Sequence, residues 1–466
     1  MLRFFRFNDP YRLLGVLLIL IVIALPLLIH PVAVTLQELK SIVLGEALND
    51  GKSLYIHLVD DTAPFAAWFA KCIEAIFSRS LTGRHIIALL FIFFQASFFA
   101  ILLINNKAYN DNTYLPALIF GLLALFSFDM LSLSPELLAS TVLLFALNNL
   151  FKEIEFKVQR DEIVLNMGVY LGIASLFVFS YFVFLVGTLI LLFLFTRLTL
   201  RKALLLIFGF ALPHALLIIF YFFWDNHGFL FQHFYAPNLT LSTLALVGLK
   251  SILILGSVPI AYFLFSLFML NREAHFTKYQ SQLLQVMFLW LIVALAEVVI
   301  TRERTPHSFY SFIPPLAYFI SHYLLLIRRK RIAEAMLWIL IIGLVTMGWA
   351  ARTGKVKSID YLALFPVESP YQSTIKEKRV LILDEGLGIY TQNKIASYFL
   401  NWNLSKQIFE HPDYFENITL IDQSFRQDAP EVIIDNNDLM RNVFERIPKL
   451  KLQYRREGDL YKKINN

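Results

Sequence analysis

The sequence predicts an α-helical polytopic membrane protein of about 11 transmembrane helices, with interfacial helices in its first outer loop and a small C-terminal α/β soluble domain. Three observations predict this class. The 466-residue chain is 58% hydrophobic and only 16% charged, whereas a typical soluble domain is about 25% charged. Several apolar runs are long enough to cross a hydrocarbon core of about 30 Å. After residue 350 the composition changes to that of a soluble segment.

The apolar runs give eleven predicted spans, with helical structure required because backbone polar groups must be satisfied inside the bilayer. The first run is too long for a signal peptide and is followed by ten more, so it is expected to be retained. The spans are residues 14–30, 85–104, 113–130, 134–150, 163–181, 183–198, 203–224, 247–270, 282–300, 310–327 and 333–350.

The basic residues of the loops predict the orientation. With the N-terminus in the cytoplasm, the N-terminal segment and the inner loops between spans hold sixteen lysines and arginines, and the outer loops between spans hold seven, as the positive-inside rule requires for loops of this length. We therefore expect a multi-pass protein of the plasma (inner) membrane, with residues 1–350 as its transmembrane domain, 31–84 as its long first outer loop and 351–466 as an extracytoplasmic domain. The basic residues flank the spans and form no stripe, so no nucleic-acid partner is expected.

The C-terminal segment contains short apolar runs typical of buried strands. These are Arg379–Asp384, Ile418–Asp422 and Glu431–Asp435, and a closing hairpin with Gly458 at its turn is expected over 454–462. The segment has no glycine-rich phosphate loop, because Asp384–Gly388 (DEGLG) does not have the GxGxxG spacing. A nucleotide-binding domain is therefore not predicted.

The first outer loop predicts two helices that lie on the membrane surface. Residues 34–49 and 65–77 both have apolar side chains at helical spacing. In the second helix these are Phe65, Trp68, Phe69, Cys72, Ile73, Ile76 and Phe77. Between the helices, Gly51–Pro64 carries His57, Asp60 and Asp61. The loop is therefore expected to hold carboxylates at the outer surface of the membrane.

This layout resembles the C-type glycosyltransferase superfamily, and within it the protein mannosyltransferases and the aminoarabinose transferases of lipid A. The matching segments, in the family's order, are Gln37–Leu39 (QEL), Gly51, Val59–Trp68 (VDDTAPFAAW), Ile76–Ser78 (IFS) and Arg302–Pro315 (RERTPHSFYSFIPP). The chain departs from the pattern twice. The family's Asp-Glu pair is Gln37-Glu38, and its Lys-Pro-Pro is Thr62-Ala63-Pro64, which lacks the lysine.

The resemblance implies transfer of a sugar from a polyprenyl-phosphate donor to a lipid, glycan or protein acceptor at the outer face of the membrane. Such a reaction needs a carboxylate to accept the acceptor's proton and cationic groups to hold the donor phosphate. Glu38 is the expected base, and Asp60 or Asp61 the supporting carboxylate. Adjacent residues of an extended segment point in opposite directions, so only one of these two is expected to face the cavity. The expected phosphate-binding residues are Arg302, Arg304, His307 and Tyr310.

No cofactor is required for this chemistry. The single cysteine, Cys72, rules out an internal disulfide and a multi-thiolate metal site. His57, His227 and His233 lack a helical metal-ligand spacing, so a divalent metal is not supported either.

Other interpretations stay open at this point. The outer-loop carboxylates and arginines would be solvated groups and headgroup anchors in a protein without catalytic activity. Asp129 and Glu297 are acidic residues within predicted spans, which makes them functional hypotheses. The aromatic loop 225–241 suits either a substrate lid or an interfacial belt. For the whole chain, the alternatives are a transporter or flippase, although no repeat symmetry is visible, and a non-catalytic scaffold with an outer binding domain.

Overall fold

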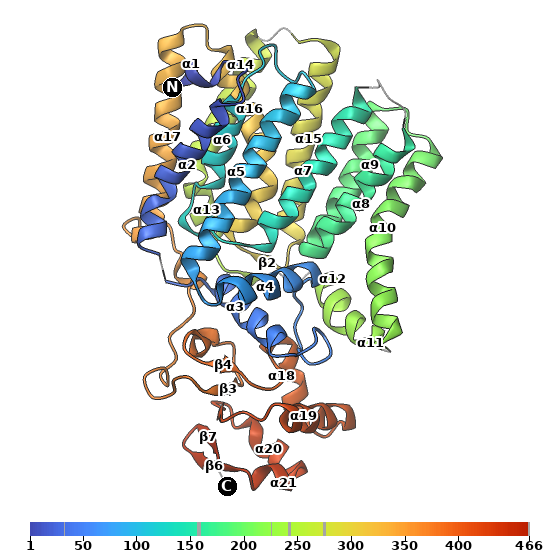
Figure 1. The fold of residues 1–466 in the computed structure, drawn as a ribbon, viewed down its shortest axis with the longest axis vertical. Coiled ribbons are helices and arrows are strands. Elements are labelled where there is room, and N and C mark those ends of the chain that lie inside the picture. Colours follow the sequence, from blue (N-terminus) through green and yellow to red (C-terminus); the bar gives the residue numbers. More distant parts are fainter. Residues whose placement is uncertain (32, 156–159, 225, 241–243, 274–275, 465–466) are drawn as a thin grey trace. The chain divides into compact units, whose positions relative to one another are not determined.

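The computed structural model describes residues 1–31, 33–155, 160–224, 226–240, 244–273 and 276–464, which form two compact units (Figure 1). The first unit comprises residues 1–33, 81–217 and 241–363. The second comprises residues 34–80, 218–240 and 364–466. The contacts therefore group the first outer loop and part of the aromatic loop with the C-terminal segment. The boundary at 350/351 stays a prediction.

The first unit is a bundle of helices, most of which run in roughly the same direction (Figure 1). They are α1 (Leu2–Phe5), α2 (Arg12–Ile29), α5 (Leu81–Asn105), α6 (Leu115–Ala124), α7 (Pro135–Ile154), α8 (Asp161–Phe177), α9 (Val183–Phe195), α10 (Leu200–Phe223), α13 (Leu249–Leu255), α14 (Ser257–Glu273), α15 (Lys278–Ile300), α16 (Ile313–Leu326) and α17 (Lys330–Thr353). Short helical turns lie at Phe128–Met130 (η1), Phe179–Phe182 (η2) and Pro306–Phe312 (η4). A two-residue parallel pair joins β1 (Leu244–Ala245) to β2 (Glu303–Arg304).

Seven of the described helical segments are long and apolar enough to cross a membrane, and the pair α13 and α14 makes an eighth if its bent halves form one span. That pair is bent by 63°. The helix α6 and the segment 179–195 are apolar but shorter. The polytopic helical class is confirmed, whereas the number of eleven spans stays a prediction.

Ion pairs at the ends of these helices join segments that the charge rule assigns to one side. The N-terminal amine of Met1 lies 2.7 Å from the Glu334 carboxylate at the start of α17. The Arg6 guanidinium lies 3.5 Å from Asp111, in the loop between α5 and α6. The N-terminus and two loops predicted to be cytoplasmic therefore meet at one end of the bundle.

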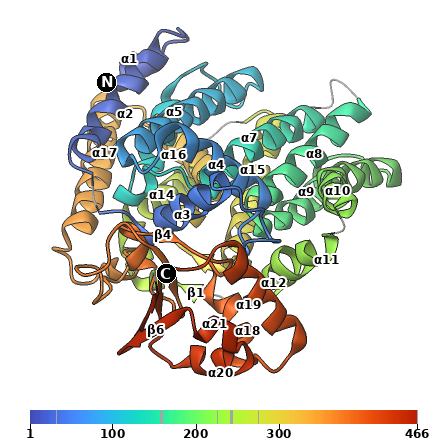
Figure 2. The same ribbon diagram turned by 60° about the horizontal axis from the view of Figure 1, so that its bottom comes forward.

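The second unit combines the helices of the first outer loop with a small sheet (Figure 2). Its helices are α3 (Leu36–Asn49), α4 (Pro64–Phe77), α11 (His227–Leu230), α12 (Ala236–Leu239), α18 (Trp402–Glu410), α19 (Phe415–Gln427), α20 (Leu439–Arg446) and α21 (Pro448–Lys451), with π-helical η3 (Phe231–Tyr235) and the 3-10 turn η6 (Leu387–Thr391). Its strands are β3 (Arg379–Ile382), β4 (Lys394–Ile395), β5 (Val432–Ile434), β6 (Tyr454–Glu457) and β7 (Leu460–Lys463), in the order β4-β3-β5-β7-β6. β3 is parallel to β4 and β5, and β7 is antiparallel to β5 and β6.

Most of the predicted elements of this unit are present. The strands at 379–382 and 432–434 and the closing hairpin lie where they are expected, and Gly458 has a φ of +67° at the turn. The prediction of a strand at Ile418–Asp422 is wrong, because these residues lie inside α19. Ile421 and Phe425 are one helical turn apart and both buried, so the apolar pattern of the longer segment is helical. The ends of the aromatic loop, residues 225 and 241, lie outside the described residues.

The two helices predicted in the first outer loop are present as α3 and α4, and they pack against each other through small residues. A Cβ atom added at Gly45 of α3 would lie 2.7 Å from the Ala70 carbonyl oxygen of α4. The large apolar side chains of α4 instead remain on the surface, where Trp68 is 40% and Ile76 69% exposed. Such an unburied apolar face suits a membrane surface.

The loop between α3 and α4 completes the core of the C-terminal segment. Val59 is buried in one cluster with Leu381, Phe399 and Ile433. Its backbone forms a parallel bridge with Phe399, in which the Val59 amide donates to the Tyr398 carbonyl at 2.8 Å. The first loop is therefore an integral part of this fold.

Arg79, which follows α4, ties the helices to the same segment. Its guanidinium makes a two-pronged ion pair with Glu46 at 2.6 and 2.7 Å. It also donates to the carbonyls of Tyr390, Thr391 and Asn393. The hydrogen bond to Glu46 raises the pKa of Arg79 further, so this cation stays charged and can satisfy all of these acceptors.

We expect Gly45→Ala to destabilise the second unit, although alanine is the better helix former. The added methyl would collide with a backbone oxygen that cannot move without separating α3 from α4, and overpacking of this kind costs about 1 to 3 kcal/mol. Thermal unfolding of the purified protein measures the loss. The control is Gly228→Ala, since an added Cβ there has no neighbour within 4 Å. Equal stability of the two variants would contradict this packing.

Candidate active site

The acidic loop, residues 50–63 between α3 and α4, follows a sharp turn at the end of α3. Gly51 has a φ of +93°, and the Lys52 amide closes the turn on the Ala47 carbonyl at 3.1 Å. Tyr55 is fully buried and also has a positive φ, +66°. Its hydroxyl donates to the Thr62 carbonyl at 2.6 Å, which joins the two ends of the loop. A non-glycine residue holds this conformation only where its surroundings enforce it, so the acidic loop is tightly fixed.

Asp60 is the most deeply buried carboxylate of the acidic loop, with 0% of its surface exposed. The Thr62 amide donates to Asp60 Oδ2 at 3.3 Å. Asp60 Oδ1 lies 3.6 Å from the Lys40 ammonium of α3 and accepts no hydrogen bond from any residue that the structure describes. A buried carboxylate oxygen without a hydrogen bond is costly for folding. This oxygen therefore keeps its capacity to accept a proton or a hydrogen bond from a ligand.

Asp61 shares the same lysine. Its Oδ1 accepts hydrogen bonds from Lys40 Nζ at 3.3 Å and from the Asn401 side-chain amide at 2.7 Å. The Asn238 side-chain amide donates to the Asp61 backbone carbonyl at 3.1 Å. The expectation that the two aspartates point in opposite directions is wrong. The Asp60 side chain accepts a hydrogen bond from the Thr62 amide, two residues further along the chain, and both carboxylates lie within 3.6 Å of the Lys40 ammonium.

Glu38 has a clear structural role at the start of α3. It forms a capping box with Thr35: its carboxylate accepts from the Thr35 amide at 3.0 Å and hydroxyl at 2.9 Å, and the Glu38 amide donates to Thr35 Oγ1 at 3.3 Å. This arrangement satisfies amides that a helix start leaves free. The predicted role of Glu38 as the base stays untested.

The predicted phosphate-binding residues lie in the other unit, the first. His307 and Tyr310 are only 2% and 0% exposed. His307 Nε2 lies 2.8 Å from both Ser132 Oγ and the Asp129 carbonyl oxygen, and the Tyr310 hydroxyl donates to the Met130 carbonyl. These two side chains thus hold the turn at residues 129–132. A role for them in binding phosphate stays a prediction.

The two predicted arginines, Arg302 and Arg304, lie just before His307 in the sequence. Arg304 belongs to β2, and its guanidinium donates to the Val299 carbonyl at 3.4 Å. Arg302 precedes β2 and, like Arg304, is half-buried. The structure therefore places all four predicted phosphate-binding residues, 302 to 310, on one continuous segment of the first unit.

The acidic residues predicted inside spans are also fixed by hydrogen bonds. Asp129 is 3% exposed and accepts from the Ser127 hydroxyl. Glu297 is 1% exposed and accepts from Ser180 at 2.6 Å and Ser311 at 3.4 Å. Hydroxyl donors of this kind reduce the cost of burying a carboxyl group. Both residues can be explained by the packing of the bundle.

His233 of η3 supports the acidic loop from its other side. Its Nδ1 lies 2.9 Å from the Tyr55 carbonyl oxygen, so this ring nitrogen carries a proton and donates it to that oxygen. Burial lowers the pKa of His233, while the hydrogen bond to Tyr55 and the nearby Asp60 charge oppose this effect. Burial also lowers the pKa of His57, and the Lys52 charge adds to the shift. Both histidines therefore favour the neutral form in the folded protein.

Sequence reasoning did not identify Lys40, Asn238 and Asn401, which contact the two aspartates. Lys40 is on α3, and its ammonium lies 3.6 Å from Asp60 and 3.3 Å from Asp61. The acidic loop itself lacks the lysine of the family's Lys-Pro-Pro motif. A lysine two residues after Glu38 was the available signal. Asn401 is 340 residues from Asp61, and no local pattern could have connected them.

Comparison with known proteins shows the fold. No protein-family model and no curated protein matches the chain. The crystal structure of ArnT from Cupriavidus metallidurans bound to undecaprenyl phosphate is similar over 96% of this chain and 97% of that one, with a TM-score of 0.55 and 12% identity. The apo state of that protein gives 92% and 94% coverage, a TM-score of 0.53 and 11% identity. The apo oligosaccharyltransferase of Archaeoglobus fulgidus gives 92% and 70% coverage, a TM-score of 0.48 and 10% identity.

The two ArnT structures extend over nearly the whole chain, so the likeness includes both units. The chain therefore has the fold of the two ArnT structures, and the predicted resemblance is confirmed for the fold alone.

We expect the second unit to lose stability as the pH falls from about 7.5 to about 5.5. In the unfolded chain His57 and His233 take up a proton near their ordinary pKa of about 6.5, whereas the lowered pKa values of the folded state delay this uptake. The unfolded state then binds more protons, so stability present above the ordinary pKa is lost below it. Thermal unfolding at the two pH values measures the change. His233→Gln, which keeps an amide donor for Tyr55, should reduce the pH dependence; an unchanged dependence would exclude His233 as its source.

Proposed function

We propose that this protein, which has the fold of ArnT, is a membrane glycosyltransferase. It moves a sugar from a polyprenyl-phosphate donor to a lipid, glycan or protein acceptor at the outer face of the plasma membrane. The observation that carries the proposal is the buried carboxylate of Asp60, whose Oδ1 accepts no hydrogen bond from the described residues although a lysine stands beside it. The ArnT fold supports it, since one of those structures was solved bound to undecaprenyl phosphate.

In this proposal Asp60 is the base. The acceptor hydroxyl gives its proton to Asp60 Oδ1 as its oxygen attacks the anomeric carbon, and the bond from that carbon to the phosphate oxygen breaks. Removing water from around the carboxylate strengthens its interaction with the developing charges. Because Asp60 is fully covered, the covering side chains must move when substrate arrives.

Lys40 has the most exposed side chain of this group, 21%, against 8% for Asp61 and 0% for Asp60, so substrate would meet Lys40 first. We assign the donor phosphate to the predicted residues Arg302, Arg304, His307 and Tyr310. Lys40 balances the charge of the two aspartates. Asp61, held by Asn401, keeps Lys40 in place.

The orientation belongs to the same proposal. The N-terminus and the basic loops are cytoplasmic, and the C-terminal domain is extracytoplasmic. The ion pairs of Met1 with Glu334 and of Arg6 with Asp111 support the grouping of these segments on one side, and the excess of basic residues in the loops of that side favours the cytoplasm.

Asp60→Asn should abolish transfer while the protein remains folded. The amide has almost the same shape but cannot take the proton, and loss of a general base costs about 10²- to 10⁴-fold in rate. The assay presents radiolabelled polyprenyl-phosphate sugars to the protein in liposomes and follows the appearance of free polyprenyl phosphate and labelled acceptor. The control is Glu445→Gln, an equivalent change at a carboxyl group of α20 that is 67% exposed. Full activity of Asp60→Asn would overturn the assignment of the base.

Two substitutions of Glu38 distinguish its role in capping α3 from a role in catalysis. Glu38→Gln keeps side-chain oxygen and capping geometry, so we expect its transfer rate to stay within about threefold of the parent's, as a cap acts on helix stability and not on proton transfer. Glu38→Ala removes the cap and should cost about 1 kcal/mol of stability. Thermal unfolding and the same transfer assay measure both effects. Abolished transfer in a fully stable Glu38→Gln would restore Glu38 as the base.

A further inference from the structure

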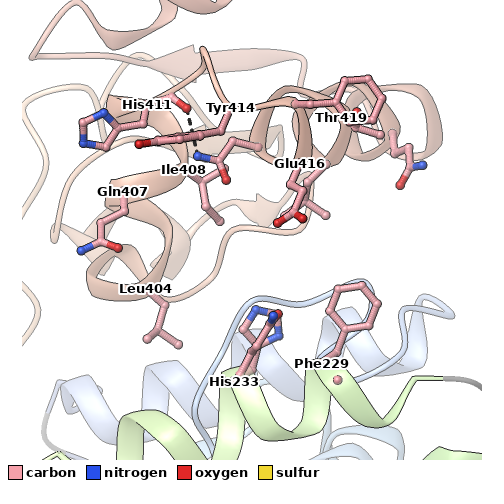
Figure 3. Close-up of a pocket in the computed structure, with 15 residues that line it drawn as sticks. Phe229, His233, Leu404, Gln407, Ile408, His411, Tyr414, Glu416 and Thr419 are labelled. Carbon is pink, nitrogen blue, oxygen red and sulfur yellow. Dashed lines mark hydrogen bonds between the residues drawn. The ribbon is translucent and has the colours of Figure 1, made fainter.

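A wide cleft lies within the second unit, between the aromatic loop and two helices of the C-terminal segment (Figure 3). One wall is formed by α11 and η3, the other by α18, α19 and the turn between them. Its volume is about 1190 Å³, which exceeds the roughly 300 to 1,000 Å³ of a small-molecule pocket. The cleft therefore has room for an extended ligand.

Aromatic rings stand on both walls of the cleft. Phe229 stacks on His233 on one wall, with ring centroids 6.0 Å apart. Tyr414 packs edge-on against His411 on the other, at 5.9 Å. Figure 3 shows Phe229 and His233 rising from one wall opposite Leu404 and Glu416. Tyr414 is 62% exposed, so its ring is available for a ligand. A flat ring of this kind packs well against the apolar C–H face of a sugar.

The polar groups of the cleft are mainly carboxamides. The side chains of Gln232, Gln407 and Gln423 line it and make no hydrogen bond with any other described residue. Each amide offers two donors and an acceptor, which matches the mixed donor and acceptor character of neighbouring sugar hydroxyls. Asn417 differs, because its amide donates to the His411 carbonyl at 2.9 Å and fixes that wall.

The charge of the cleft is low. Among the described residues that line it, Glu416 is the one with a formal charge when the histidines are neutral. A phosphate-rich or acidic ligand would require arginines or lysines, and none belongs to this lining. The lining therefore favours a neutral ligand that carries many hydroxyl groups.

The cleft is linked to the acidic loop through one histidine. His233 lines the cleft and also contacts the Tyr55 carbonyl. Asn238, in the helix that follows η3, holds the Asp61 carbonyl. A ligand bound along this wall would thus contact the segment that positions the two aspartates.

We propose that the cleft binds a neutral oligosaccharide, the part of the acceptor next to the hydroxyl that receives the new sugar. This inference rests on the proposed function for its role, whereas oligosaccharide binding itself can be measured without any transfer. Aromatic rings on both walls, uncommitted carboxamides and the lack of basic side chains in the lining together support a glycan over a phosphorylated ligand.

The test measures binding of three neutral tetrasaccharides, built from glucose, mannose and N-acetylglucosamine, to the full chain. The protein is placed in lipid nanodiscs without glycoside detergent, which would compete, and binding is followed by saturation-transfer NMR and calorimetry. We expect at least one tetrasaccharide to bind. Tyr414→Ala and Phe229→Ala should each weaken this binding about threefold to tenfold, the range expected for loss of one stacking contact.

Two control variants accompany these changes. Tyr414→Phe keeps the ring and should bind as the parent does. Leu452→Ala removes an equally exposed large side chain, 80% exposed in the same unit, from outside the cleft, and should also have no effect. Binding that survives both alanine changes, binding of none of the three tetrasaccharides, or binding of an unstructured peptide at the same residues would overturn the proposal.

Asp60→Asn distinguishes this proposal from the proposed function. We expect the variant to bind the tetrasaccharide as tightly as the parent while it loses transfer. An inactive parent that binds oligosaccharide would overturn the transferase and leave the cleft assignment standing. An active parent that binds none of the probes would overturn the cleft assignment and leave the transferase standing.

Discussion

Two adjacent buried carboxylates share a single lysine, and the second unit is arranged around this constraint. A carboxylate without water around it is stable only with a cation or hydrogen-bond donors nearby. Lys40 contacts both Asp60 and Asp61, and Asn401 adds a donor for Asp61 alone. The remaining oxygen of Asp60 is left without a hydrogen bond from the described residues. A fold that tolerates such an oxygen gives up stability, which is a common feature of sites that bind a reacting group.

The position of this lysine and these carboxylates depends on segments that are far apart in the sequence. α3 supplies Lys40, and its close contact with α4 at Gly45 keeps the acidic loop between them short and bent. The C-terminal segment supports one side of that loop through Phe399 and Asn401, and His233 with Asn238 supports the other. Three of these supports contact the main chain of the loop, at Tyr55, Val59 and Asp61, and Asn401 contacts the Asp61 side chain directly.

Periodicity and loop charge predicted much of this molecule. The membrane class, both surface helices, two strands and the closing hairpin follow from local patterns whose physical causes act over a few residues. The prediction failed at Ile418–Asp422, where five apolar and polar residues suit a strand or a helix face equally well. At the candidate site, Asp60 and Asp61 were selected from their place in the motif, whereas the contact of both with Lys40 could not be predicted without the local structure at Thr62. Asn401 could not be predicted, because contacts between distant segments leave no periodic trace.

The bridge between Val59 and Phe399 also has a consequence for how the protein is made. The residues that complete the surroundings of the acidic loop are synthesised about 340 positions after it, and closing so long a loop is entropically unfavourable until both partners exist. During synthesis the acidic loop therefore lacks these contacts, and its aspartates stay hydrated, until the intervening helices have been made. A chain interrupted before residue 399 therefore lacks the Phe399 and Asn401 contacts that support the acidic loop.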